Sequence, residues 1–302
     1  QGVIARAGIN YHLNANDIID SAAVIPRDVK PTATIISVAS WDGFYTGLNA
    51  GYGFGTSSNA QSFGWANPSA NGYVGSVALA LANSYTGRNI NQGGFIGGGQ
   101  VGYNYLYTQN LIIGLEADMQ GSGISGQGNS NGWAPFSQSN GGVESYVGLN
   151  PIQAGINWMG TFRGRIGYLV SPTVATYVTG GLAYGGTYLK TFPSFIYASS
   201  IGGSYFDPMY LSTQNSQQNF NVGWTVGGGA EWMVAQNWSI KGEALYYNLG
   251  NTSVSNTLYG SPMGPDSFAG GSSNKAYYQG VTSRLGVNYH FSLASSPVVA
   301  KF

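Results

Sequence analysis

The chain has 302 residues with 11 basic and 11 acidic side chains, so its formal net charge is zero and only 7% of its residues are charged. Soluble domains carry roughly 25% charged residues, and a balanced charge favours neither a nucleic acid nor an acidic substrate as partner. The absence of cysteine excludes disulfides and thiol catalysis.

Residues 1–13 repeat the pattern of residues 279–291 without a gap. Both stretches alternate apolar with polar or very small residues, as a β-strand does when successive side chains point to opposite faces. The residues that are identical in register are Gln1, Gly2, Val3, Arg6, Gly8, Asn10, Tyr11 and His12. Convergence on a common strand pattern is one explanation. We favour an extra N-terminal strand, which comes from an upstream tandem barrel or pairs with a partner molecule.

The sequence starts without an initiating Met or a signal peptide, so we expect Gln1 to be a processed or truncated start. Residues 14–40 are polar and then interrupted by Pro26 and Pro31, which predicts a linker, here expected to be periplasmic. Residues 41–291 are expected to form one barrel, and residues 292–302 a C-terminal tail.

Eight alternating segments predict the strands of this barrel. They are residues 41–55, 93–107, 110–120, 157–170, 173–188, 221–234, 237–250 and 277–291. Their connections alternate between tight turns at 108–109, 171–172 and 235–236 and long segments at 56–92, 121–156, 189–220 and 251–276. This rhythm is typical of an eight-stranded antiparallel up-and-down transmembrane β-barrel, with short periplasmic turns and four long extracellular loops. No apolar run approaches the ~20 residues of a membrane helix.

The charged residues of the strands share one face, which decides between a membrane barrel and a soluble one. By alternation this face holds Glu116, Asp118, Arg163, Arg165, Glu231, Lys241, Glu243 and Arg284. The opposite face carries Leu115, Phe162, Ile166, Trp224, Val226, Trp232 and Ile240. An Arg or Lys facing lipid at mid-depth costs roughly 2–4 kcal/mol, so we place the charges in the lumen. Because eight strands enclose only enough room for side chains, the network is expected to be a plug rather than a channel lining.

Aromatic residues cluster near the predicted strand ends, as in the interfacial girdles of membrane proteins. The predicted girdle consists of Trp41, Phe44, Tyr103, Tyr168, Trp232, Trp238, Tyr246, Tyr289 and Phe291. The long loops also carry bulky residues, which either cap the barrel mouth or contact neighbouring molecules or a surface ligand. The candidate loop contacts are Trp65, Trp133, Phe192, Phe195 and Phe206.

Signatures of catalysis and of cofactor binding are weak. Residues 97–102 spell a dinucleotide fingerprint but are followed by another alternating segment instead of a helix. The two histidines, His12 and His290, have no further ligands at a recognised metal spacing. We therefore expect no cofactor, no metal and no enzymatic activity.

Four stretches, 41–55, 162–185, 223–250 and 283–291, resemble the small outer-membrane barrel proteins of alphaproteobacteria, the surface-antigen or opacity-type porin-like family. The ending PVVAKF is also similar to the usual terminus of that family. The resemblance implies an eight-stranded barrel of the Gram-negative outer membrane, without catalytic residues, that supports envelope integrity and sometimes allows slow diffusion. The length of the loops and the strand-like residues 1–13 depart from the family pattern.

We therefore expect a structural outer-membrane barrel with a charge-plugged lumen, surrounded by outer-membrane lipid and lipopolysaccharide and packed in an oligomer or array. The loops are expected outside the cell and the barrel termini in the periplasm. Two alternatives stay open at this stage: a narrow porin for water or small solutes, and an adhesin or surface receptor built from the loops.

Overall fold

The computed structural model describes residues 41–56, 59–66, 88–129, 131–137, 143–201, 204–205, 209–260 and 268–291. The chain divides into two compact units, Gln1–Ser37 and Val38–Phe302, and every described residue belongs to the second. The predicted extra strand at 1–13, the whole predicted linker at 14–40 and the C-terminal tail at 292–302 lie outside the described residues. None of the described residues forms a helix long and apolar enough to cross a membrane.

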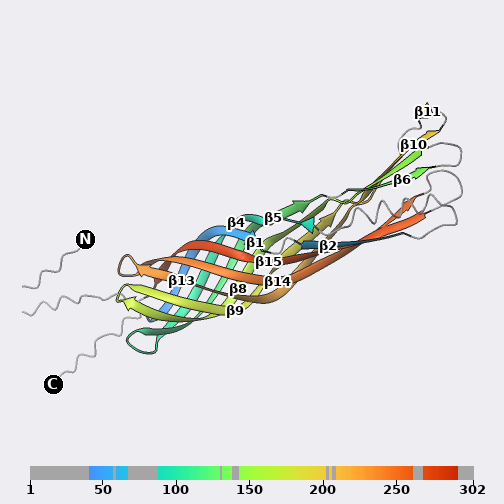
Figure 1. Cartoon of the computed structure of the whole chain (residues 1–302). Coiled ribbons are helices and arrows are strands. Elements are labelled where there is room, and N and C mark those ends of the chain that lie inside the picture. Colours follow the sequence, from blue (N-terminus) through green and yellow to red (C-terminus); the bar gives the residue numbers. More distant parts are fainter. Residues whose placement is uncertain are drawn as a thin grey trace, which may run out of the picture. The chain divides into compact units, whose positions relative to one another are not determined.

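Eight antiparallel strands close into a ring (Figure 1). In ring order they are β1 (Gly43–Gly55), β4 (Gly93–Leu106), β5 (Leu111–Gly128), β8 (Ile152–Ser171), β9 (Val174–Thr191), β13 (Asn215–Met233), β14 (Trp238–Gly260) and β15 (Phe268–His290). The ring closes because β1 pairs with both β4 and β15. The predicted eight-stranded antiparallel barrel is confirmed, and each predicted strand corresponds to one strand of the ring.

The connections predicted as long loops contain further strands. Seven short strands lie there: β2 (Asn59–Ala66), β3 (Arg88–Asn89), β6 (Asn131–Ser137), β7 (Val143–Leu149), β10 (Ser194–Ile201), β11 (Ser204–Tyr205) and β12 (Met209–Ser212). Strand β2 pairs with the far part of β15, while β6, β7, β10, β11 and β12 form a separate sheet. Strands β5, β13 and β14 also run well beyond their predicted ends at the side away from the tight turns. These segments are therefore partly an extension of the barrel wall.

The stagger of the ring sets the tilt of its strands. A path of paired residues leaves β1 at Gly43 and returns to β1 at Gly53, ten residues further along. It passes through Asn104, Gly114, Arg165, Thr179, Gly227, Leu245 and Thr282. Ten residues of stagger over eight strands correspond to a tilt of roughly 40–45°, the usual range for closed barrels.

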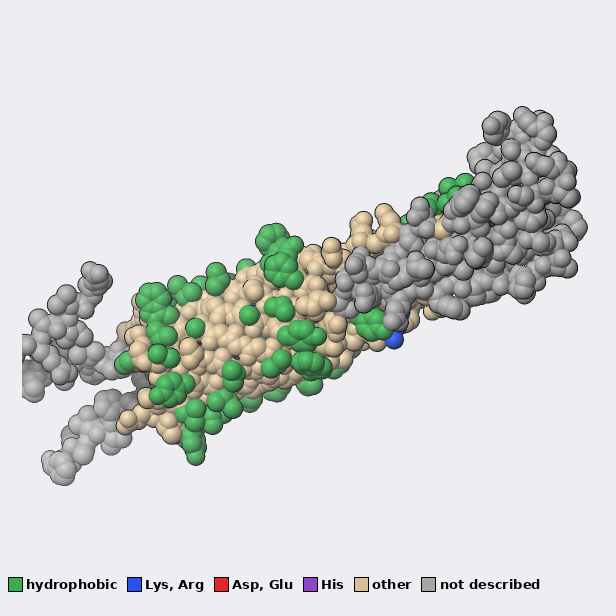
Figure 2. Space-filling view, viewed as in Figure 1, with side chains coloured by type: hydrophobic (Ala, Val, Ile, Leu, Met, Phe, Trp, Pro, Cys, Tyr) green, Lys and Arg blue, Asp and Glu red, His purple; other side chains and the backbone are tan. Residues whose placement is uncertain are grey.

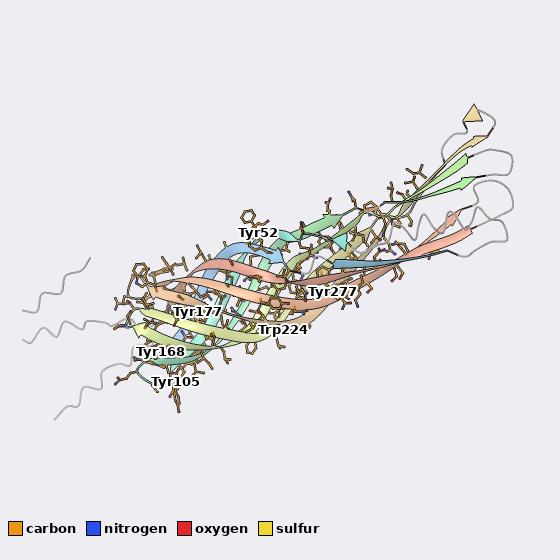
Figure 3. The ribbon with its side chains drawn as sticks, viewed as in Figure 1. Tyr52, Tyr105, Tyr168, Tyr177, Trp224 and Tyr277 are labelled. Carbon is orange, nitrogen blue, oxygen red and sulfur yellow. The ribbon has the colours of Figure 1, made fainter. Side chains whose placement is uncertain are left out.

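Hydrophobic side chains cover the outer face of the ring, as Figure 2 shows for one side of the barrel. They form two bands of aromatic side chains with aliphatic side chains between them. The band nearest the tight turns contains Phe44, Tyr103, Tyr105, Tyr107, Tyr168, Trp232, Trp238, Tyr289 and Phe291. The second band contains Tyr52, Phe54, Phe95, Trp158, Tyr184, Phe220, Trp224 and Tyr246. Figure 3 shows Tyr105 and Tyr168 near the turns and Tyr52 and Trp224 further along the barrel. About ten residues separate Phe44 from Phe54 on β1, which gives a band spacing of roughly 25 Å, the height of the apolar belt of outer-membrane barrels.

Beyond the second aromatic band the distribution of polar and apolar side chains between the two faces of the wall is reversed. On the turn side of this band, apolar side chains face outward and charged ones inward. On the other side, buried side chains include Ile156, Leu189, Leu249 and Tyr278, while polar ones such as Ser253 face outward. Two irregularities shift the alternation by one residue, one between Ile156 and Trp158 and one between Asn248 and Asn251. The wall therefore changes from a membrane pattern to the pattern of a soluble β-sheet.

Candidate functional site

The structure brings all eight predicted lumen charges together in one buried layer inside the ring. Glu116 and Asp118 come from β5, Arg163 and Arg165 from β8, Glu231 from β13, Lys241 and Glu243 from β14, and Arg284 from β15. Alternation along five strands aims these side chains inward, and the register sets Glu116 opposite Arg163 and Glu243 opposite Arg284. Four acids face four bases, so the layer has no formal net charge.

Arg163 is the centre of this charged layer, with its side chain fully buried. Its guanidinium donates to Glu116, to Asp118 at 3.0 Å and to Glu243 at 2.8 Å. Arg284 bridges two of these acids from the opposite wall, at 2.6 Å to Glu243 and 2.7 Å to Asp118. The planar fork of arginine suits such bridging, because several donors diverge from one rigid group.

Two further cations complete the charged layer. Lys241 Nζ lies 2.9 Å from both carboxylate oxygens of Glu116. Arg165 donates to Glu231 at 3.0 Å, and its guanidinium lies over the Tyr177 ring at 4.1 Å from the ring centroid. Each of the eight charged groups therefore has at least one ion-pair partner.

Uncharged side chains also bond to the charged layer, and sequence reasoning did not name them as part of it. Those that donate to its carboxylates are Tyr45 on Glu116 (2.6 Å), Tyr177 on Glu243 (3.1 Å), Thr161 on Asp118 (2.8 Å), and Ser239 and Asn288 on Glu231 (2.6 and 2.7 Å). His290 Nε2 lies 3.2 Å from Glu231. Alternation places Tyr45, Tyr177 and Asn288 on the inward faces of their strands, so parity was the signal that could have identified them.

An apolar layer lies between the charged layer and the tight turns. It consists of Trp41, Ile112, Leu169, Ala175 and Met233. The prediction that Trp41 belongs to the aromatic girdle is wrong, because this side chain is only 4% exposed and lies inside the barrel end. Its indole N–H donates to the Pro172 carbonyl at 3.0 Å, and its ring meets His290 edge-on at 5.8 Å. Trp41 therefore closes the turn end of the barrel.

Replacing Trp41 by phenylalanine is expected to lower the free energy of unfolding by about 1–2 kcal/mol, because it removes the Pro172 hydrogen bond and leaves a gap in the layer. Urea unfolding in lipid vesicles measures this change. The matched control is Trp232→Phe on the lipid-facing surface, where a smaller effect is expected. Equal effects for both variants would show that Trp41 does not close the barrel end.

A second, larger apolar layer lies on the other side of the charged layer. It consists of Ile90, Ile96, Ile124, Ile152, Ala154, Ile156, Met159, Ala183, Leu189, Tyr247, Leu249, Val254, Ala276 and Tyr278. These residues come from predicted strand ends and predicted loops, and sequence reasoning did not place them inside the barrel. This layer therefore presents buried apolar side chains to the interior of the barrel.

Polar side chains within this second apolar layer join strands that are not neighbours in the ring. Thr187 on β9 and Thr252 on β14 lie 3.1 Å apart, and Asn256 on β14 donates to Thr191 on β9 at 2.6 Å. The hydroxyl of Tyr278 on β15 donates to the Tyr188 carbonyl on β9 at 2.7 Å. These bonds therefore cross the interior past β13. The described interior is thus filled at three successive levels.

The other predicted surface residues fall into two groups. Phe44, Tyr103, Tyr168, Trp232, Trp238, Tyr289 and Phe291 lie in the aromatic band near the turns, whereas Tyr246 lies in the opposite band beside Trp224, at 5.3 Å between ring centroids. Of the candidate loop contacts, Phe192 is half-buried just after β9. Trp65, Trp133 and Phe195 lie in β2, β6 and β10, but their side chains are outside the described part of the structure, as is the whole of Phe206.

Among the residues that the structure describes, no group of three or more His, Cys, Asp or Glu side chains is arranged to hold a metal ion. The residues 97–102, which spell a nucleotide fingerprint, belong to β4 and pair with β1 and β5 along the wall. Their environment is that of a barrel strand, not that of a phosphate-binding loop.

Comparisons with known proteins identify relatives for most of the chain. It is 31% identical over 241 residues to the 31 kDa outer-membrane immunogenic protein of Brucella melitensis, covering 80% of this chain and 84% of the relative. It is 29% identical over 151 residues to the 22 kDa outer membrane protein of Rhizobium leguminosarum, covering 49% and 51% of the two chains. No protein-family model matches the sequence.

Solved structures with a similar fold include two outer-membrane proteins. The outer membrane protein OprG of Pseudomonas aeruginosa is 10% identical, with 83% of this chain and 97% of that chain covered and a TM-score of 0.36. Neisserial surface protein A is 12% identical, with 83% and 98% covered and a TM-score of 0.29.

Proposed function

The chain belongs to the family of the 31 kDa outer-membrane immunogenic protein, and from this membership and the filled interior we propose that it is a structural barrel that does not conduct solutes. Its relatives are outer-membrane proteins of alphaproteobacteria, so the predicted family and the predicted outer-membrane localisation are confirmed. The role of the barrel within that membrane is the proposal developed below.

The single observation that supports this role is the charged layer between two apolar layers. A conducting pore needs a continuous wet path lined by polar groups, as in the larger porins. Here the eight charges bond to one another and to neighbouring hydroxyls and amides, which leaves few groups free to solvate a passing ion. The apolar layers around Trp41 and around Ile124 would exclude water on either side.

The proposal includes an orientation. Tight turns at residues 107–110, 172–173 and 234–237 mark one end of the barrel, and the extended strands with β2 and β6 mark the other. Short periplasmic turns and longer external segments are the rule for such barrels, so we place the tight turns in the periplasm. The wall beyond the second aromatic band has polar residues outside and apolar ones inside, which suits a segment that projects into water.

The narrow-porin alternative is less favoured by this geometry, because opening the charged layer alone would leave two apolar layers in place. The adhesin alternative and the predicted oligomer or array depend on loop side chains outside the described residues, so both stay predictions. As part of the same proposal the protein has no catalytic role, since its buried carboxylates are engaged by cations.

Vesicle swelling tests the proposal. Vesicles that contain the full chain are expected not to swell in arabinose or glycine, whereas vesicles with a general diffusion porin swell. The amount of folded barrel in the same vesicles is measured by its heat-modifiable migration on gels, so that absence of swelling is not confused with failed insertion. An Arg163→Ala/Arg165→Ala variant is expected to stay closed because the apolar layers persist. Swelling by the unmodified chain in proportion to its amount would overturn the proposal.

A further inference from the structure

Strand β15 lies between β14 and β1 in the ring (Figure 1). Its inward residues bond to the charged layer. Arg284 donates to Glu243 on β14 at 2.6 Å and to Asp118 on β5 at 2.7 Å. Asn288 donates to Glu231 on β13 at 2.7 Å. The inward face of this one strand therefore contacts acids from three other strands.

The other inward residues of β15 are also closely surrounded. His290 is buried in the charged layer. A Cβ atom added to Gly280 would lie 2.8 Å from the Tyr247 hydroxyl. One added to Gly286 would lie 3.1 Å from the Leu48 carbonyl oxygen. The interior of this barrel, and not strand formation in general, thus determines which residues these positions accept.

Residues 1–13 repeat the inward residues of this part of β15. Residues 279–291 have six inward positions, all buried, and five of them carry the same residue in the repeat: Gly2, Arg6, Gly8, Asn10 and His12. Only three of the seven outward positions match, at Gln1, Val3 and Tyr11. A common strand pattern requires alternation, but it does not require the same residues at the positions of Arg284, Asn288 and His290. The repeat therefore preserves the residues that contact the interior.

An inward face of this kind needs carboxylates that the repeat does not carry. Residues 1–13 contain Arg6 but no Asp or Glu. In the described barrel all four acids of the charged layer already have cationic partners, and Arg284 bonds to both Glu243 and Asp118. An arginine buried without a carboxylate is strongly destabilising. The repeat therefore suits a different ring, one with its own acids on the strands equivalent to β5, β13 and β14.

The direction of the chain is consistent with a ring that precedes this one. Strand β15 ends beside a tight turn, where the His290 N–H donates to the Asn237 carbonyl at 2.7 Å, and β1 begins at the same end because Tyr45 pairs with His290. The last residue of 1–13 in an equivalent strand would lie at that end too. Residues 14–40 would then not cross the membrane, and these 27 residues reach up to roughly 90 Å when extended. A ring of eight tilted strands is only roughly 17 Å wide between backbones.

A second copy of this chain is a less suitable partner. Its own β15 already fills the position between β14 and β1. Residues 268–277 of β15 continue the pairing with β14, and residues 270–275 also pair with β2. An exchanged strand would first have to displace all of these pairs.

We propose that residues 1–13 are the last strand of a second barrel, which precedes the described one in the same polypeptide and has a charged layer of the same arrangement. In that barrel Arg6 bonds to acids on the third and seventh strands, as Arg284 does here. Asn10 and His12 bond to an acid on the sixth strand. The segment thus joins two homologous barrels through the linker that follows it.

A graft in the full 302-residue chain tests whether this segment suits a last-strand position. The substitutions that give residues 279–291 the sequence of residues 1–13 are Thr282→Ile, Ser283→Ala, Leu285→Ala, Val287→Ile and Phe291→Leu. The grafted chain is expected to fold in lipid vesicles as completely as the unmodified chain, measured by its heat-modifiable migration, because the inward polar residues and glycines are retained. A second graft keeps Thr282, the one inward residue that differs.

The matched control removes the inward contacts instead of the outward residues. An Arg284→Leu/Asn288→Leu/His290→Leu variant is expected to lower the folded fraction by about tenfold or more, because the acids of the charged layer lose their partners. Failure of both grafts to fold would overturn the proposal. Folding of the Leu control as complete as that of the grafts would also overturn it, since the inward residues would then not select the interior.

Trypsin digestion tests the second barrel in the native protein, purified from its own outer membrane in a neutral detergent. Arg27 and Lys30 lie in the predicted linker, and Arg6 lies in the proposed strand. Mass spectrometry of the peptides is expected to show cleavage after Arg27 or Lys30 and protection of Arg6 inside a folded barrel. The 302-residue chain by itself is the control, in which Arg6 has no matching acids and is expected to be cleaved.

Two results would overturn the proposal in different ways. Cleavage at Arg6 in the native protein would show that no second barrel holds this segment. Protection of Arg6 in a native chain that starts at Gln1 would assign the other strands to a separate molecule and overturn the position in the same polypeptide. Vesicle swelling by the described barrel is measured independently, so failure here is distinguishable from failure of the closed-barrel proposal.

Discussion

Replacing Arg163 by methionine is expected to lower the free energy of unfolding by about 3–5 kcal/mol, because removing one partner leaves buried charge uncompensated. Arg163 is fully buried and bonds to Glu116, Asp118 and Glu243, so three carboxylates lose a donor at once. The charged layer would also change from no formal net charge to one excess negative charge. Urea unfolding of the folded barrel in phospholipid vesicles, followed by tryptophan fluorescence, measures the change.

A second substitution separates charge balance from packing. The Arg163→Met/Glu243→Gln variant restores the balance and is expected to be more stable than the sum of the two single changes predicts, since a matched loss leaves no excess charge. The Arg163→Lys variant keeps the charge but loses the fork that reaches three acids, so an intermediate loss is expected. Strict additivity of the two single changes would show that the eight charges do not act as one layer.

Alternation alone identified the ring strands and the direction of their charged side chains. Strand β8 is an example, because its two faces differ in polarity. Phe162 and Ile166 form an apolar face that can contact lipid, whereas Arg163 and Arg165 form a charged face that must point into the lumen. The cost of arginine in hydrocarbon made the choice clear before any three-dimensional information. The same alternation placed Trp41 and Tyr45 on the face of Asn49, opposite Phe44 and Leu48. The aromatic character of Trp41 suggested a girdle residue, and its parity was the better guide.

Strict alternation of inward and outward side chains no longer predicts which residues face the lumen where the strands contain bulges. On β14 the inward residues are Leu245, Tyr247 and Leu249 before the bulge and Thr252 and Val254 after it. Gly250 lies at this point with a φ of +77°, a left-handed conformation that glycine adopts without strain. A bulge adds one residue and reverses the two faces of the sequence pattern. The sequence pattern of the residues that follow therefore predicts a loop, although these residues continue the strand.

The second apolar layer was missed for a different physical reason. Within the membrane the solvent of the outer face is lipid, so apolar residues face outward. Beyond the membrane edge the solvent is water, and burial of Ile156, Leu189 and Tyr278 inside the wall becomes favourable. Within one continuous strand, the apolar side chains therefore face outward in the membrane and inward beyond it. A sequence analysis that expects apolar residues on the outer face throughout ends each strand where this arrangement changes, near the second aromatic band.

Replacing Leu48 by arginine is expected to lower the free energy of unfolding by about 2–4 kcal/mol, because a cation at mid-depth on the lipid face loses its hydration. Leu48 is 73% exposed on the outer face of β1, between Phe44 of the turn-side band and Phe54 of the opposite band. Four residues along the same strand, Phe44→Arg places the same charge at the interface, where about 0–1 kcal/mol is expected for the charge. The two variants thus locate the apolar belt on the barrel.

Matched controls isolate the charge in this comparison. Leu48→Gln and Phe44→Gln remove the same apolar side chains without adding a cation. The difference in free energy of unfolding between the Arg and Gln variants at each position therefore reports the cost of the charge at that depth. Urea unfolding in vesicles of one lipid composition gives all four values. A smaller Arg–Gln difference at Leu48 than at Phe44 would contradict the belt deduced from the two aromatic bands.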